Sequence, residues 1–344
     1  MKEVCEYYIL QSTADNHAVR EAACHCISEL CTKVAAEVDK EPFKPYITPM
    51  IAALLDCFKD ASWPVRDCAC LACGHFVATF PEESKPVFEE LCTLWVAHLS
   101  DNIQSVREHS AQSIVQVMKC AYKEELKAVV VKYIDANLMK AKEQGSSSSK
   151  FSGLQNETQF GVAKPHDHEQ FAGDSEHLNG VMYSCGSLAP KLKRGGGCMD
   201  HGFTRPMEAW ELSDGGIFVL REVSSIEDMH DYVASKLESL SNLGYIDHFK
   251  HSNTMKENLF KSMAVILRNI GKKKFRNQVE IFLDPAFRNA KNQEHQNMSY
   301  AAQDFILAME RTYGQGIFKA ILEGHDDRFI QDLEGYKEVG QNMQ

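Results

Sequence analysis

The sequence predicts an all-α fold, an α-solenoid of paired antiparallel helices that is interrupted by a long insertion. Three observations lead to this prediction. The first two are that a segment with the apolar spacing of a helix occurs three times in residues 14–120, and that another helical pattern precedes each copy. The third is glycine content, because residues 1–144 contain one glycine, Gly74, whereas residues 145–202 contain ten. Since glycine disfavours helix interiors, its distribution separates helical from non-helical chain.

Each copy of the repeated segment has Val-Arg near the start of its helix, at Arg20, Arg66 and Arg107. These arginines are 46 and 41 residues apart, a period that fits two helices in each unit of a stacked array. Counted from each arginine, small or apolar residues recur at offsets of −1, 3, 7, 10 and 11, which lie on one face of an α-helix. We therefore expect three equivalent helices that bury equivalent stripes.

A partner helix is expected before each arginine-bearing helix. Residues 3–11, 45–58 and 85–99 have helical patterns, and prolines stand in the first turns of the last two, where proline is tolerated. Residues 124–140 predict one more amphipathic helix, with no arginine-bearing helix after it.

The spacing of acidic and basic residues carries a family resemblance. Asp60 precedes Arg66 by six residues, and Asp101 precedes Arg107 by six, each arginine being followed by a small residue and an apolar stripe. This pattern resembles the HEAT repeat, an armadillo-like α-solenoid unit. In the first copy Asp15 is only five residues from its arginine, which predicts a tighter turn there.

The resemblance implies a ladder of side chains between neighbouring repeats. An arginine at the start of each second helix can bond a carboxylate in the next turn and satisfy groups left bare at helix ends. Isolated surface pairs would contribute little, but recurrence in register at three places favours a ladder. Its predicted members are Arg20, Asp60, Arg66, Asp101 and Arg107.

Composition divides the chain into four parts. Residues 1–140 are the HEAT-repeat segment, and residues 141–205 form a flexible insertion containing Gly, Ser and His, because few aliphatic residues there could offset the entropy of ordering. Residues 206–335 form a second, degenerate HEAT-like helical segment, in which Ser299 takes the place of the arginine. Residues 336–344 form a tail.

Cysteine usage points to buried thiols. Ten of the twelve cysteines lie between Cys5 and Cys120, and clusters such as Cys24-His25-Cys26 suggest zinc. The repeat alignment favours core packing instead, because Cys24 aligns with Cys70 and with Ala111, as expected of a small buried hydrophobe. Reduced cysteines and the lack of an apolar signal sequence predict a cytoplasmic protein, with the nucleus as an alternative.

The insertion contains a second group of metal-ligand types, and their spacing matches no fixed zinc pattern. We predict no cofactor, and metal binding by this group stays an open alternative. Its members are His166, His168, His177, Cys185, Cys198 and His201.

Several function classes are disfavoured by charge and motifs. The net charge of −11 disfavours a nucleic-acid partner, which needs clustered basic surface. No run of eighteen apolar residues is present, so we expect no membrane partner. The chain has no Gly-x-Ser-x-Gly, phosphate-loop or His-Glu-x-x-His motif, and we expect a protein that is not an enzyme.

A solenoid presents a long curved surface that suits protein–protein binding. The resemblance implies that the second helices line the concave side, where the residues beside the core stripe are mainly acidic. We therefore expect a scaffold or adaptor that binds basic segments of other proteins. The expected contact residues are Glu21, His25, Asp67, Glu108 and Gln112.

Two alternatives belong to other classes. One is a transport receptor resembling the importin-beta group, which would bind basic cargo through a similar acidic face. The other is a microtubule binder, because Trp63, in the turn between paired helices, resembles the aromatic residue of tubulin-binding TOG domains. The equivalent turns hold His17-Ala18 and Gln104-Ser105 and lack the basic residues of TOG surfaces.

A short basic run, Lys272-Lys273-Lys274-Phe275-Arg276, remains. It is a minimal match to a nuclear-import signal or an anion-binding patch, but such runs also occur at helix C-termini, where they offset the helix dipole.

Overall fold

The computed structural model describes residues 2–36, 41–146 and 206–342. Within these ranges the chain forms α-helices and short 3-10 helices, with no β-strand. It divides into two compact units. The described residues of the first are 2–36, 41–133 and 206–211, and those of the second are 134–146 and 212–342.

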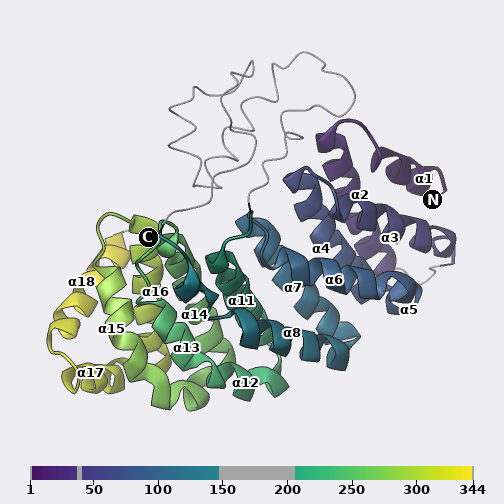
Figure 1. The fold of residues 1–344 in the computed structure, drawn as a ribbon. Helices are drawn as coiled ribbons and strands as arrows, with labels where there is room; N and C mark the ends of the chain where they lie inside the picture. Colours follow the sequence, from purple (N-terminus) through teal and green to yellow (C-terminus); the bar gives the residue numbers. More distant parts are fainter. Residues whose placement is uncertain (1, 37–40, 147–205, 343–344) are drawn as a thin grey trace, which may run out of the picture. The chain divides into compact units, whose positions relative to one another are not determined.

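The first unit contains the three helix pairs. Helix α4 (Trp63–Thr79) packs against two other second helices, α2 (His17–Ala36) and α7 (Gln104–Cys120), and the three lie side by side in Figure 1. Each has a first helix packed beside it, and the short α5 (Pro81–Ser84) and η1 (Lys85–Val87) precede the third of these. The first helices are α1 (Lys2–Gln11), α3 (Lys44–Phe58) and α6 (Phe88–His98). The first unit is therefore a stack of three helix pairs, the arrangement that the repeated segment predicts.

The core of this unit is made from equivalent positions of successive repeats. Cys24, Cys70 and Ala111, which align in the sequence, are all fully buried. Burial raises the pKa of the Cys70 and Cys73 thiols, because a thiolate would lose its hydration there. No disulfide joins the described cysteines, and no cluster of metal-ligand side chains occurs among the described residues.

Close contact between α4 and α7 explains the one glycine of residues 1–144. A Cβ at Gly74 would lie 2.7 Å from Ser113 Oγ and 3.0 Å from its Cα. The Ser113 hydroxyl donates to the Cys70 carbonyl at 3.1 Å, and the Trp95 indole N–H donates to the same carbonyl at 3.3 Å. Gly74 is therefore required by packing, not by backbone conformation.

The second unit is also built from packed helices. Helix α16 (Gln296–Tyr313) packs against α14 (Ser252–Phe275) and α15 (Val279–Ala290), and then against α17 (Gln315–Glu323) and α18 (Arg328–Asn342). Buried aromatic rings of Phe275, Phe282 and Phe305 meet between these helices. The unit also contains η2 (Lys140–Glu143), α12 (His230–Ser235), α13 (Leu237–Leu243), the 3-10 helices η3 (Glu227–Met229) and η4 (Arg276–Gln278), and the shared ends of α8 (Lys123–Asn137) and α11 (Ala209–Val223).

The structure differs from two of the predicted boundaries. Residues 140–143 form η2, and Ala141 is buried, with its N–H donating to Ser213 Oγ at 2.7 Å. The start of the predicted insertion therefore belongs to the second unit. The predicted tail is likewise helical, because α18 continues to Asn342. Residues 147–205, with the insertion's cysteines and histidines, lie outside the described residues. None of the described helices combines the length and the apolarity needed to cross a bilayer.

Candidate functional site

The first rung of the ladder joins α2 to the turn before α4. Arg20 donates two bonds to the Asp60 carboxylate, Nε to Oδ2 at 2.7 Å and Nη2 to Oδ1 at 3.0 Å. The two side chains are only 15% and 13% exposed. This fork geometry matches the planar guanidinium to the carboxylate and gives a directional, charge-assisted contact.

The second rung repeats the first one repeat later. Arg66 Nε and Nη2 donate to Asp101 Oδ2 and Oδ1 at 3.0 and 3.3 Å. Each aspartate has a further role, because Asp60 Oδ1 accepts the Ser62 N–H at 2.8 Å and Asp101 Oδ1 accepts the Ile103 N–H at 2.9 Å. One carboxylate therefore binds the preceding repeat and orders the start of its own second helix.

The predicted tighter turn in the first copy is wrong. Arg20 Nη1 donates to the carbonyl of Ala14, six residues earlier, at 2.9 Å. Arg66 bonds the Asp60 carbonyl with the same offset, at 3.0 Å. The first turn therefore has the same geometry with Ala14 in the aspartate's place, and Asn16 Oδ1 accepts the Ala18 N–H at 2.9 Å.

The third rung uses residues that sequence reasoning missed. Arg107 is 1% exposed, and its Nη1 donates to the Asp101 carbonyl at 2.7 Å. The same nitrogen lies 3.8 Å from Glu211 Oε1, and the guanidinium carbon lies 4.9 Å from the centre of the Trp210 ring. Glu211, fully buried, accepts the Glu208 N–H at 2.8 Å. A Glu three residues after the N-cap, bonded back to the N-cap N–H, is part of a capping box, and this spacing could have identified the helix start.

The ladder holds the predicted contact residues in register. Glu21, Asp67 and Glu108 each follow a ladder arginine by one residue, and all three are partly exposed. His25 is exposed and Gln112 is partly exposed. We call the five residues Glu21, His25, Asp67, Glu108 and Gln112 the second-helix surface.

Histidines bridge neighbouring second helices beside this surface. His109 Nδ1 on α7 lies 2.7 Å from Asp67 Oδ1 on α4, and His75 Nδ1 on α4 lies 2.9 Å from Ser28 Oγ on α2. Burial lowers the pKa of His75, because the charged imidazolium loses hydration. The Asp67 carboxylate, 15% exposed, therefore already has a partner on α7.

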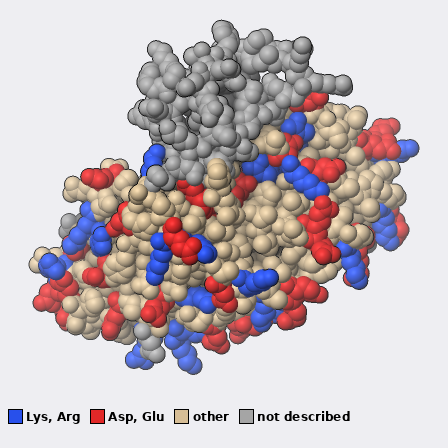
Figure 2. All heavy atoms as spheres, viewed as in Figure 1, with Lys and Arg blue, Asp and Glu red and all other residues tan. Residues whose placement is uncertain are grey.

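Trp63 is the first residue of α4 and is followed by buried Pro64. Its side chain is partly exposed, and its buried indole N–H has no hydrogen-bond partner among the described residues. Over the described surface in view, acidic and basic side chains are interspersed (Figure 2).

No protein-family model and no curated protein matches the chain. Among solved structures, a designed armadillo repeat protein shares 12% identity at a TM-score of 0.36, covering 89% of this chain and 99% of its own. An engineered protein shares 11% identity at a TM-score of 0.38, covering 91% of this chain and 98% of its own. Yeast importin-beta shares 16% identity at a TM-score of 0.38, covering 98% of this chain and 37% of its own.

Proposed function

We propose that the chain is a non-catalytic scaffold or adaptor that binds basic segments of other proteins through the second-helix surface. The observation that carries the proposal is the equal register of Glu21, Asp67 and Glu108 on three adjacent helices. Because the ladder fixes the start of each helix, these carboxylates are positioned before a partner arrives. Binding therefore needs little ordering of the scaffold.

The spacing of the helices suggests the form of the partner. Packed helices lie about 8–10 Å apart, and a segment in the polyproline II conformation advances about 3.1 Å per residue with three residues per turn. A segment of this kind that crosses the helices would place every third side chain on one face, about 9 Å apart, and so near a carboxylate. A basic residue at every third position is the pattern that fits best.

The experiment uses a fluorescent synthetic peptide with arginine at every third position and Gly and Ser between. Fluorescence anisotropy measures its affinity for the full chain. Glu21→Lys combined with Glu108→Lys should weaken binding by about tenfold or more, because two attractive contacts become repulsive. Raising the salt concentration well above about 0.1 M, where the Debye length is about 10 Å, should weaken it further.

The matched control makes the same charge changes on two helices outside the second-helix surface. Glu89→Lys with Glu124→Lys alters two exposed acids of α6 and α8, so the net charge changes equally. This control should retain the affinity of the unsubstituted chain. Equal loss in both double variants would mean that the peptide responds to overall charge, and the second-helix surface would no longer be a candidate. A peptide of the same composition with its arginines in one block should bind more weakly.

A further inference from the structure

The second unit has a groove between α15 and α17. Two adjoining cavities of about 600 and 360 Å³ share Glu280, Ile317 and Ile321 in their linings. One end of the groove is basic and the other contains a histidine. The remaining lining residues are Lys272, Arg276 and Tyr313 at the basic end, and Ala320, Gly324 and His325 at the other.

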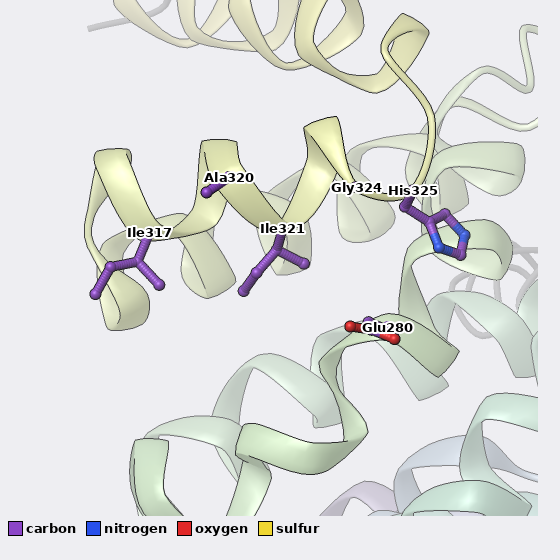
Figure 3. Close-up of a pocket in the computed structure, with 6 residues that line it drawn as sticks. All are labelled: Glu280, Ile317, Ala320, Ile321, Gly324 and His325. Carbon is purple, nitrogen blue, oxygen red and sulfur yellow. The ribbon is translucent and has the colours of Figure 1, made fainter.

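One wall of the groove is apolar and open to water. Ile317 is 53% exposed. Ile321, one helical turn later, extends from α17 on the same side, and the Glu280 carboxylate on α15 lies opposite (Figure 3). A partner that covered both isoleucines would remove apolar surface from water, which favours binding.

The charges of the groove are available to a partner. Lys274, in the same basic run, pairs with Asp231, but among the described residues no carboxylate pairs with Lys272 or Arg276. Lys272 Nζ instead donates to the Tyr313 carbonyl at 3.3 Å. Glu280 likewise has no cationic partner among the described side chains. The groove therefore has a positive end and a negative wall.

The basic end is held in place by two glycines and a reciprocal contact. Gly271 and Gly314 have φ values of 77° and 85°, which side chains other than glycine rarely adopt. They end the helical path just before Lys272 and α17, respectively. The Tyr313 hydroxyl donates to the Lys272 carbonyl at 3.3 Å. Lys272 and Tyr313 therefore each donate one hydrogen bond to the backbone of the other. The groove is thus pre-formed, which lowers the entropic cost of binding.

We propose that the α15–α17 groove binds a short amphipathic helix of a partner protein. Leucine-type side chains one turn apart would cover Ile317 and Ile321. An acidic residue at one end of the partner helix would face Lys272 and Arg276, and a basic residue further along it would face Glu280, which lines both cavities. This site goes beyond the second-helix surface, because it lies in the other unit and selects an acidic end together with apolar residues.

The test uses a labelled synthetic helix-forming peptide with glutamates at one end, leucines at positions i and i+4, and lysines at the other end. Anisotropy should detect binding to the full chain. Arg276→Glu and, separately, Ile317→Asp should each weaken binding by about tenfold. A peptide with lysines at both ends should bind poorly to the unsubstituted chain and better to the Arg276→Glu variant.

Two controls separate the groove from general effects. Lys319→Glu reverses a charge on α17, at a side chain that is 60% exposed and lies 4.0 Å from Glu323. This variant should bind the peptide normally. Leu10→Asp introduces the same acid at an exposed apolar residue of α1 and should also bind normally.

Three results would overturn the proposal. They are failure of the peptide to bind the unsubstituted chain, equal binding by the Arg276→Glu and Lys319→Glu variants, and concentration-dependent dimers in sedimentation that Ile317→Asp abolishes. The last would assign the groove to a second copy of the chain. Glu21→Lys with Glu108→Lys should leave this peptide's affinity unchanged, so the site and the proposed function can fail separately.

Discussion

The two units use the fourth residue of a second helix in different ways. In the first unit that residue is a ladder arginine, such as Arg66, whose guanidinium reaches the aspartate of the next repeat. In α16 of the second unit it is Ser299, whose hydroxyl donates to the Ala290 carbonyl at 2.6 Å, at the end of the preceding helix α15. A serine is too short to reach further, so its bond stays within its own helix pair.

Buried amides connect elements further apart in the second unit. Asn258 Nδ2 lies 3.0 Å from Asp214 Oδ1 on α11, and Asn289 Nδ2 donates to the Gly244 carbonyl at 2.9 Å. The two contacts span 44 and 45 residues, but their acceptors differ, one being a carboxylate and the other a backbone carbonyl. The comparison teaches that a long, planar, charged side chain can repeat one contact from unit to unit, whereas short polar side chains depend on their local surroundings.

The largest expected effect tests the third rung. Arg107→Met should lower the free energy of unfolding of the first unit by about 3–5 kcal/mol, because it removes a buried cation whose Nη1 lies 3.8 Å from the buried Glu211 carboxylate. Hydrogen exchange read by mass spectrometry should show faster exchange in α4 and α7.

Ser299→Ala is the matched change in the second unit. It removes one neutral hydrogen bond, and we expect a cost of about 0.5–1.5 kcal/mol, seen in α15 and α16. Equal costs for the two variants would show that the ladder arginine has no greater role than a local hydrogen bond.

A smaller effect tests the helix contact that the ladder accompanies. Gly74→Ala should destabilise the first unit by about 1–3 kcal/mol, because its Cβ would contact Ser113 and force α4 and α7 apart. Gly335→Ala in α18, where a Cβ meets nothing within 4 Å, should instead stabilise by up to about 1 kcal/mol through helix propensity. Thermal denaturation of both variants gives the sign of each change in stability. A Gly74→Ala variant that is more stable than the unsubstituted chain would contradict the close packing of α4 and α7.

The smallest effect concerns pH. Burial lowers the pKa of His75 and of His98 from the ordinary 6.5. Below that value the unfolded chain binds more protons than the folded one, so the first unit should lose stability as the pH falls through this range. Hydrogen exchange at pH 7.5 and pH 5.5, corrected for intrinsic rates, should show this in α4 and α6. Replacing both histidines by glutamine should remove most of the difference between the two pH values, and an unchanged difference would assign it to other groups.

The repeated part of the fold could be predicted from the sequence because its contacts are periodic. The stripe positions and the ladder residues recur at fixed offsets, and each offset has a helical meaning. The partner of Arg107 could not be predicted in this way, because Glu211 follows the insertion and breaks the period. The α15–α17 groove was also not predicted, since it depends on two helix ends that meet only in three dimensions.

Asp60 and Asp101 each bond both an arginine and a helix start, and this affects how the first unit unfolds. Each carboxylate accepts hydrogen bonds from the arginine of the preceding repeat and from a backbone N–H at the start of its own second helix. Unfolding of one helix pair therefore also removes a contact that orders its neighbour. In stacked arrays with nearest-neighbour coupling, loss of order spreads from a weak point along the stack. Loss of one arginine–aspartate contact should therefore cause unfolding that spreads from that helix pair to its neighbours in the first unit.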